Sequence, residues 1–448
     1  MPEHPNHRAF NEQIIQSTRQ WLEDGDFRHR HKRRQQDFTR RSPLDFVNTA
    51  VLLLQKTVRS AHRHLSEFFD RLGPSAASVT ASAWCQGRLR LRHTAFIELN
   101  QRTILEPVYQ VGSAFEVRRW RGHRLLSIDS SLLHLPPTEE VGREFGWVQC
   151  QNQKGHCGRY AQGRLSVLTD VLNRLAVQTL LVGWQTGERA LAARHLEATG
   201  SEDLVLMDRG FAGYELFARF VVAGRHFVCR CPRYSFGAVN RLFKEDREGR
   251  SVVATLTPAN GTVGDIRAAE LPEELQIRLV TVRLSTGELE VLATNLLDEQ
   301  VYETSAFAEL YHQRWGIETF YGLLKGRLDL ENFSGRSVEA VRQDLYATIF
   351  LSNLESVLSR PVQDRLARDS APLRQAQQVN RAVSFHALKC NLIALLLSRD
   401  PPSLVLEKLD RLFAGNPVSV RPQRKVPRTK ISAWRSYWFH RHVRKSVF

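Results

Sequence analysis

Apolar residues recur three and four positions apart near both ends of the chain, a spacing that places them on one side of an α-helix. Helical spacing of this kind covers 10–24, 44–72, 345–358, 388–397 and 404–413. Residues 75–104 add a shorter, helix–turn–helix-like pair of segments. The pattern predicts an α-helical region over 1–115 and a second α-helical region over 336–420.

The centre of the chain follows a different pattern, in which short apolar runs alternate with single helices. Predicted strands cover 123–129, 164–170, 176–182, 203–208 and 226–231. The second and third strands form a hairpin, and helices over 188–198 and 214–224 flank the fourth strand. The first and fourth strands end on carboxylates, Asp129 and Asp208. Residues 116–232 therefore follow the order expected of a ribonuclease H-like core, in which these two strand ends lie side by side.

After this core the chain becomes strand-like again, with Gly, Pro and Asn between the runs. The runs lie at 251–256, 275–284 and 289–294. We predict a β-rich insertion over 233–300, followed by the last part of the core over 301–335.

The segment 311–325 combines an apolar arc with four reactive side chains. Tyr311, Arg314, Glu318 and Lys325 are three, four and seven positions apart. At about 100° per residue these four side chains fall within roughly 60° of one another on a helix. A carboxylate beside two cations and a phenol suits metal-assisted chemistry on a phosphate group. The alternative is an amphipathic surface helix with one intrahelical ion pair.

The spacing Tyr-x2-Arg-x3-Glu-x6-Lys resembles the signature of the DDE transposases of bacterial insertion sequences, in the group named after these four residues. Asp208, in Met-Asp-Arg-Gly-Phe, resembles the second catalytic Asp of that family, and Asp129, in Ile-Asp-Ser-Ser, matches the first by order and position. The resemblance implies an α/β ribonuclease H-like catalytic core with a β-rich insertion. An α-helical amino-terminal DNA-binding region and an α-helical carboxy-terminal region would flank it.

The resemblance makes Asp129, Asp208 and Glu318 the predicted catalytic residues and metal ligands. Three converging carboxylates repel one another unless a cation lies between them. Hydrolysis and transesterification of phosphodiesters also need the phosphate charge to be neutralised. A two-metal site with Mg²⁺, for which Mn²⁺ can substitute, meets both needs.

Four other side chains are candidates for contacts with DNA phosphates. The resemblance assigns this role to Tyr311, Arg314 and Lys325. Arg314 would bind a phosphate through two parallel hydrogen bonds, and Lys325 would act as a point charge. Arg209, directly after Asp208, is a weaker candidate, with a simple salt bridge as the alternative.

Aromatic residues in the insertion bear on the route of cleavage. Some members of the family hold a flipped base against a Trp there, but 233–300 contains no Trp. Tyr234, Phe236 and Phe243 could stack on a base instead, because any aromatic face serves. Cleavage through a DNA hairpin is therefore left open.

The charge of the chain points to a polyanionic partner. The chain carries 63 Lys and Arg against 47 Asp and Glu, a net charge of +16. Nucleic acid and an anionic membrane surface are the two candidates. No apolar run reaches the ~18 residues that span a bilayer, and the first residues do not resemble a signal peptide. These features favour double-stranded DNA rather than a membrane as the partner, and they favour a cytoplasmic location.

Basic residues gather in three segments, 28–34, 86–92 and 421–448. The last holds nine Lys and Arg, no acid, and several aromatic residues, which suits contact with nucleic acid. A solvated basic face is the alternative for the first two segments, and a disordered tail is the alternative for the third.

The sequence is thus interpreted as a cut-and-paste transposase that binds the terminal inverted repeats of its element, cleaves them and joins the ends to target DNA. Pairing of two ends implies a homodimer in the synaptic complex. One alternative is a metal-dependent DNA nuclease on the same fold. The other is a non-catalytic DNA-binding repressor derived from a transposase.

Overall fold

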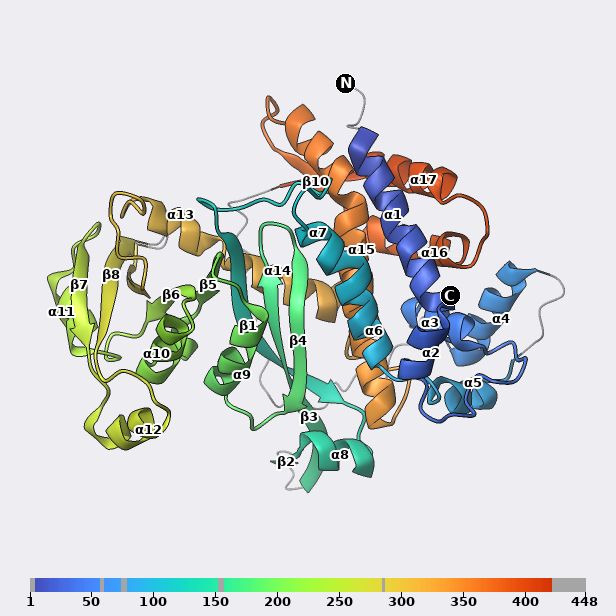
Figure 1. Ribbon diagram of the computed structural model, residues 1–448, viewed down its shortest axis with the longest axis horizontal. Coiled ribbons are helices and arrows are strands. Elements are labelled where there is room, and N and C mark those ends of the chain that lie inside the picture. The colour runs from blue at the N-terminus through green and yellow to red at the C-terminus, as the bar shows by residue number, and fades with distance from the viewer. Residues whose placement is uncertain (1–4, 57–59, 74–78, 152–156, 284–286, 421–448) are drawn as a thin grey trace. The chain divides into compact units, whose positions relative to one another are not determined.

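The computed structural model describes residues 5–56, 60–73, 79–151, 157–283 and 287–420 (Figure 1). The predicted basic tail lies outside these residues. The chain divides into two compact units. The sheet unit comprises 118–133 and 163–323, and the helical unit comprises 1–117, 134–162 and the residues from 324 onward.

One mixed sheet dominates the sheet unit. Its strands run in the order β4-β3-β1-β5-β6-β9-β8-β7, and β2 pairs with β3 in the helical unit. β1, β5 and β6 are parallel neighbours, and the β3–β4, β6–β9, β9–β8 and β8–β7 pairs are antiparallel. The strands are β1 (Arg124–Leu135), β2 (Trp147–Gln151), β3 (Cys157–Asp170), β4 (Leu175–Gly183), β5 (Asp203–Met207), β6 (His226–Cys231), β7 (Ser251–Leu256), β8 (Leu275–Arg283) and β9 (Leu289–Thr294).

The central strands are buried on both faces, as their nearly continuous apolar sequences predict. Along β5, Val205 and Met207 belong to one hydrophobic cluster, whereas Leu204 and Leu206 belong to another. This alternation follows from the two-residue period of a strand. The helices of this unit are α9 (Glu188–His195), α10 (Tyr214–Val222), α11 (Gly237–Glu245), α12 (Val263–Ala268), α13 (Ala306–His312) and α14 (Trp315–Gly322).

The predicted strands and helices from β1 to β6 occur in the predicted order, including the β3–β4 hairpin. The helix α8 (Glu139–Phe145) and the strand β2, which lie between β1 and β3, were not predicted. The three strands predicted after this core are also confirmed. They extend the central sheet, because β9 pairs with β6, and β8 and β7 follow it. The short helices α11 and α12 between them were not predicted, since 233–300 was interpreted from its strand-like runs alone.

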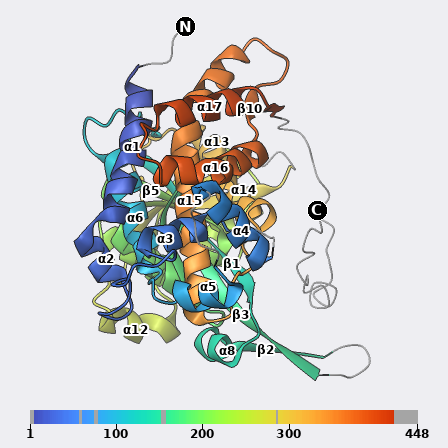
Figure 2. The same ribbon diagram turned by 90° about the vertical axis from the view of Figure 1, so that its right-hand side faces the viewer.

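In the helical unit, α15 (Val338–Asp369) lies among shorter helices and is buried along most of its length (Figure 2). The others are α1 (Pro5–Glu23), α2 (Gly25–His31), α3 (Phe46–Leu54), α4 (Ala61–Leu72), α5 (Ala81–Arg88), α6 (Thr94–Leu99), α7 (Glu106–Tyr109), α8 (Glu139–Phe145), α16 (Arg381–Leu396) and α17 (Ser403–Ala414). A π-helical turn over Asn100–Leu105 joins α6 to α7, and β10 (Gln377–Val379) pairs with β11 (Pro417–Ser419).

The prediction of helical structure over 44–72 needs a correction, because two helices occupy this range. α3 ends at Leu54, and α4 begins after Ser60, whose side chain accepts a hydrogen bond from the backbone N–H of Arg63. Such an N-cap satisfies one of the free N–H groups at a helix start and so favours a new helix there. Apolar spacing alone did not reveal this break.

Candidate active site

Two of the predicted carboxylates are placed by neighbouring parallel strands. In the β1–β5 pair, Ile128 lies opposite Met207, so that Asp129 and Asp208 occupy the next positions on adjacent strands. Asp208 follows the last residue of β5, as predicted. The prediction that β1 ends at Asp129 is wrong, because β1 continues to Leu135. The polar pair after Asp129 interrupts the apolar run without ending the strand, and Leu133 and Leu135 are buried again.

Asp129 lies in an electrostatically strained environment. The pKa of its carboxyl is raised to about 6, chiefly by burial and also by the nearby carboxylates of Glu188 and Asp208. A hydrogen bond from the Ser130 N–H, 2.8 Å away, and the charge of Arg314 act in the opposite direction and lower the pKa. Three acidic groups of the sheet unit therefore influence one another at this point.

The raised pKa of Asp129 leads to a prediction about metal binding and pH. Because the pKa lies above the usual value near 4, Asp129 holds a proton between about pH 4 and pH 6. If Asp129 is a metal ligand as predicted, a bound cation displaces that proton, and the apparent affinity for Mn²⁺ should fall by up to about tenfold for each pH unit below about 6. Titrations with Mn²⁺ at pH 5, 6 and 7 would check this. An affinity that stays constant from pH 5 to 7 contradicts the prediction.

Asp208 is bordered by a phenol and a guanidinium. The Tyr311 hydroxyl donates to Asp208 Oδ1 over 3.4 Å, and Arg230 Nη1 lies 3.9 Å from the same oxygen. Glu290 on β9 holds Arg230 through contacts of 2.5 Å to Nε and Nη2. Tyr311 is nearly buried, so in this structure its hydroxyl is oriented toward a carboxylate of the site.

The segment that carries the signature is not one continuous helix, which corrects the prediction. α13 ends at His312, Gln313 and Arg314 form a turn, and α14 begins at Trp315. A π-helical turn over Leu323–Arg327 follows. The backbone N–H groups of the turn bond three residues back, so the regular 100° projection does not hold across it. The apolar arc of the segment is nevertheless buried, as predicted.

Arg314 and Glu318 form an ion pair with 3.0 Å between Arg314 Nη2 and Glu318 Oε1. The Arg314 side chain is buried and its guanidinium carbon lies 5.6 Å from the ring centre of Tyr311 and 5.2 Å from that of Trp315. Among the described residues, Arg314 Nε has no hydrogen-bond partner. The intrahelical ion pair considered from the sequence is present, but the Arg side of it is buried rather than on the surface.

Lys325 and Arg209 stand in different surroundings. Lys325 belongs to the helical unit, where burial lowers the pKa of its amino group and Glu331 lies 3.9 Å away. Arg209 is exposed directly after Asp208. Within the described residues no ion pair to Arg209 occurs, so the salt-bridge alternative has no support.

Glu188 is a residue that sequence reasoning missed. It begins α9, accepts a hydrogen bond from the Ser130 hydroxyl and lies 2.8 Å from Arg164 Nη1. An acidic residue in the first turn of a helix is common because it complements the helix dipole, so the sequence carried no special signal. Arg230 and Glu290 were also missed, because they lie far apart in the sequence and only the folded sheet brings them together.

The donor chemistry at Asp129 and Asp208 fits a hard divalent cation, which prefers carboxylate oxygens. The raised pKa of Asp129 is the response of a buried carboxylate that lacks enough positive charge nearby. In the part of the chain that the structure describes, no three His, Cys, Asp or Glu side chains gather closely enough to hold one metal ion. Glu318 is paired with Arg314 instead, and its role as a third ligand stays a prediction.

The aromatic candidates in the insertion differ in exposure. Phe236 and Phe243 pack against the hydrophobic core of the sheet unit. Tyr234 is 81% exposed and has the Arg233 guanidinium 5.9 Å from its ring centre. Of the three, Tyr234 alone presents an open ring face.

The mixed sheet of this α/β protein places two carboxylates on adjacent parallel strands. Comparison with known proteins gives its family. The family model described as "Transposase DDE domain" matches residues 120–354, more than half of the chain. The protein therefore belongs to this family. It is a transposase, an enzyme that binds and cleaves DNA and transfers its strands, and the family uses a divalent metal. The resemblance seen in the sequence is confirmed at this level.

Individual relatives agree with this assignment. The chain is 24% identical over 318 residues to the transposase InsG for insertion sequence element IS4 of Escherichia coli (strain K12), which covers 70% of this chain and 69% of the relative. It is 27% identical over 159 residues to the putative transposase y4zB of Sinorhizobium fredii (strain NBRC 101917 / NGR234), covering 35% and 42%. A cryo-EM structure of the piggyBac transposase synaptic complex with hairpin DNA aligns over 92% of this chain and 86% of that chain. Its identity is 13% and its TM-score 0.44, which supports no conclusion about this fold.

No helix in the described residues is both long and apolar enough to cross a bilayer.

Proposed function

We propose that this transposase acts in the bacterial cytoplasm on the ends of its own insertion sequence, with Asp129, Asp208 and Glu318 as its catalytic carboxylates. It would bind the terminal inverted repeats, cleave them with water and join the freed 3′-hydroxyls to target DNA. The observation that carries the proposal is the placement of Asp129 and Asp208 on adjacent parallel strands. The strand order β4-β3-β1-β5-β6 supports a ribonuclease H-like core.

Two Mg²⁺ ions, for which Mn²⁺ can substitute, would supply an activated oxygen nucleophile and neutralise the phosphate charge at these carboxylates. Asp129 and Asp208 would hold them from the sheet, and Glu318 from α14. Arg314 is proposed to bind a phosphate oxygen, and its buried guanidinium group, whose Nε has no partner among the described residues, would have to become accessible for this. Lys325 and Arg209 would add positive charge along the DNA.

Tyr311 is proposed to act through Asp208 as well as on the DNA. Its hydroxyl lies 3.4 Å from Asp208 Oδ1 and 3.4 Å from the carbonyl oxygen of Met207. With Arg230 on the other side, the carboxylate of Asp208 is held in one orientation.

The helical unit is proposed to bind the element ends through a surface that two basic segments build together. Arg33 N–H donates to the Arg90 carbonyl, and Arg92 N–H donates to the His31 carbonyl, each over 2.8 Å. This main-chain bridge joins the segments 28–34 and 86–92, which the sequence singled out separately. Arg33, Arg90 and Arg92 are exposed. We call the surface formed by these three residues the basic bridge.

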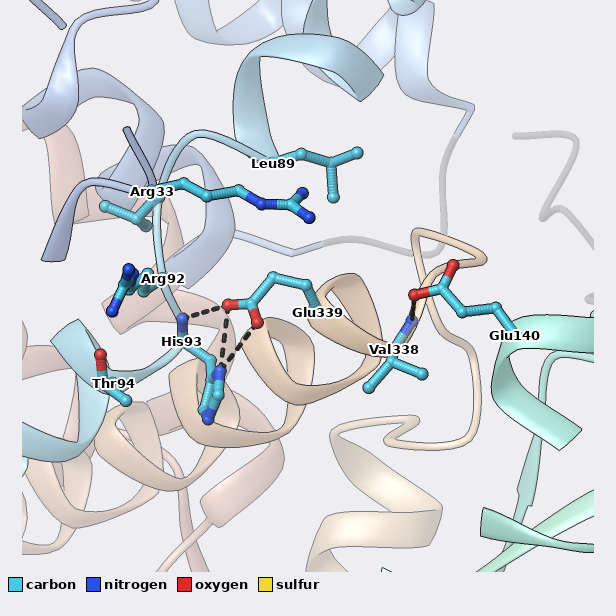
Figure 3. A pocket seen from close by; sticks show the side chains of 9 residues that line it. Arg33, Leu89, Arg92, His93, Thr94, Glu140, Val338 and Glu339 are labelled. Atoms are coloured by element: carbon cyan, nitrogen blue, oxygen red, sulfur yellow. Dashed lines mark hydrogen bonds and ion pairs between the residues drawn. The ribbon is translucent and has the colours of Figure 1, made fainter. Parts of the chain in front are cut away.

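Beside the basic bridge lies a hollow of about 410 Å³ (Figure 3). Arg33 and Arg92 line one side of it. His93 on its wall is held by Glu339, which accepts from the backbone N–H and from Nδ1 of His93. Glu140 also lines the hollow, and its Oε1 accepts a hydrogen bond from the Val338 N–H over 3.1 Å. Both carboxylates of the hollow therefore have partners within the protein, and the exposed guanidinium groups remain available to phosphates.

Replacing Arg92 by Ala is expected to weaken DNA binding without changing its sequence preference. Loss of one phosphate contact should reduce the slope of log affinity against log salt concentration by about 1. Binding measured by fluorescence anisotropy at several salt concentrations would check this. Arg374→Ala, an exposed Arg of the same unit outside the basic bridge, is the matched control. Equal losses in both variants would remove the basic bridge from the proposal.

The test of the proposed function uses labelled DNA that carries the element ends, a target plasmid and Mg²⁺ or Mn²⁺. We expect metal-dependent cleavage and joined products with the wild-type protein, and neither with Asp208→Asn. Cut ends without joined products would indicate the nuclease alternative. DNA binding without cleavage in either metal would indicate the repressor alternative. Sedimentation of the DNA complex would test the proposed homodimer.

A further inference from the structure

The hydroxyl group of Tyr321 links the helix of one proposed catalytic residue to the strand of another. Tyr321 lies on α14, three residues after Glu318. Its hydroxyl oxygen is 2.8 Å from the carbonyl oxygen of Asp129 on β1 and 3.2 Å from that of Leu165 on β3. The Tyr321 side chain is buried, so no solvent competes for this bond.

Two side-chain hydroxyl groups, those of Tyr321 and Ser166, lie near the carbonyl oxygen of Asp129. Ser166 Oγ lies 3.4 Å from that oxygen, but it also lies 2.9 Å from His195 Nε2. His195 Nδ1 is 2.6 Å from Gln178 Oε1, an acceptor, so Nδ1 carries the proton of the ring. Nε2 then accepts the hydroxyl proton of Ser166. Tyr321 is therefore the short side-chain donor to the Asp129 carbonyl oxygen.

A second contact, on the other side of Glu318, holds α14 close to Val171 in the turn between β3 and β4. A Cβ atom at Gly316 would lie 3.2 Å from Val171 Cβ, closer than side chains normally approach. Gly316 and Tyr321 therefore bracket Glu318 along the helix, one by close packing and the other by a hydrogen bond. Residues three apart lie on the same side of a helix, so the Tyr321 bond also limits rotation of Glu318 about the helix axis.

We propose that Tyr321 is a positioning residue that sets the separation between the carboxylates of Asp129 and Glu318. It does not touch DNA or metal. It acts through the main chain, because the carbonyl that it binds belongs to the residue whose side chain is the first carboxylate. This inference rests on the proposed roles of Asp129 and Glu318. Outer partners that orient metal ligands typically contribute 10-fold to 100-fold to metal affinity or activity.

The experiment compares the full-length wild-type protein with Tyr321→Phe, which keeps the ring and removes the hydroxyl. Mn²⁺ binding without DNA, followed by the electron paramagnetic resonance signal of the free ion, is expected to weaken about tenfold. The Mg²⁺ concentration for half-maximal DNA cleavage should rise by a similar factor. The cleavage rate should return toward the wild-type value at high Mg²⁺, which damage to the fold would not allow.

Tyr214→Phe is the matched control. Tyr214 is also nearly buried in the sheet unit, and its hydroxyl donates to the Pro272 carbonyl over 2.7 Å, outside the carboxylate site. We expect its Mn²⁺ affinity to equal that of the wild type. Equal Mn²⁺ affinities of Tyr321→Phe and Tyr214→Phe would overturn the proposal.

A second variant covers the case in which Tyr321→Phe lowers the melting temperature more than the control does. Gly316→Ala keeps the hydroxyl group and forces α14 away from Val171. Weaker Mn²⁺ binding in Gly316→Ala supports the proposal, and unchanged binding contradicts it. A wild-type protein that binds Mn²⁺ without cleaving DNA would refute the proposed reaction, while the ratio of Mn²⁺ affinities would still decide the role of Tyr321.

Discussion

Glu318→Gln is expected to lower DNA cleavage by on the order of 10³-fold or more, since it removes a charged group from the place where charge develops in the reaction. The amide has the shape of the carboxylate but no negative charge, and hard cations bind neutral amide oxygens less well. Arg314 can still donate to the amide oxygen, as it donates to Glu318 Oε1 now. Local packing around α14 should therefore survive, and the loss would report on chemistry.

DNA binding separates the chemical effect from misfolding. The net charge of the chain rises by one in Glu318→Gln, so affinity for DNA should stay the same or increase slightly. Glu309→Gln, an exposed Glu on the neighbouring helix α13, carries the same charge change without touching the site. Full cleavage in Glu318→Gln, or an equal loss in Glu309→Gln, would exclude Glu318 as a catalytic residue.

Sequence reasoning succeeded where a local pattern decides the structure. All five residues of β5 are buried, and an unbroken apolar run bounded by polar residues is typical of such a strand. The position of Asp208 follows directly from where that run ends. Asp129 was predicted by the same reasoning, but the predicted strand ended too early. Ser130 is polar and only half-buried, and it interrupts the apolar run without ending β1.

The parts of the site that were missed depend on residues far apart in the chain. Ser130 and Glu188 are 58 positions apart, and Arg230 and Glu290 are 60 positions apart. No periodicity within a segment contains information about such pairs. The turn at Arg314 inside the signature was missed for another reason. Its residues have ordinary helical propensity, and tertiary packing overrides so weak a preference.

A buried ion pair in the helical unit also joins residues that lie far apart in the chain. Breaking this pair is expected to cause a large loss of stability. Arg88 on α5 and Asp344 on α15 are 1% and 0% exposed, with 2.7 Å between Arg88 Nη2 and Asp344 Oδ1. The sequence showed Arg88 only as part of a basic segment, with DNA as the expected partner. Instead its guanidinium group also donates to Gln343, Ser334 and the Ala340 carbonyl.

Burial alone would raise the pKa of Asp344, but the charges of Arg88 and Lys56 reverse the effect and hold the pKa below its usual range. A carboxyl group with a lowered folded pKa stabilises the fold above its unfolded pKa of about 4. That contribution is lost as the pH falls through the folded pKa. The pair should therefore remain intact at every pH at which the enzyme would hold a metal ion.

Asp344→Leu is expected to lower the free energy of unfolding by about 3–5 kcal/mol, because it leaves the buried charges of Arg88 and Lys56 without this carboxylate. Urea denaturation followed by circular dichroism would measure this. Glu106→Ala, which breaks the exposed pair with Arg102, should cost less than about 1 kcal/mol and is the control.

The double variant Arg88→Met/Asp344→Leu distinguishes the cost of a stranded charge from the value of the pair itself. Apolar side chains of similar size can replace a buried ion pair with little loss, because neither charge then has to leave water. We therefore expect the double variant to recover the part of the lost stability that comes from the Arg88 charge. The buried charge of Lys56, 4.0 Å from Asp344 in the wild type, still lacks this carboxylate. If the double variant is as unstable as Asp344→Leu, the hydrogen bonds of Arg88 to Ser334, Gln343 and the Ala340 carbonyl contribute more to stability than the charge pair does.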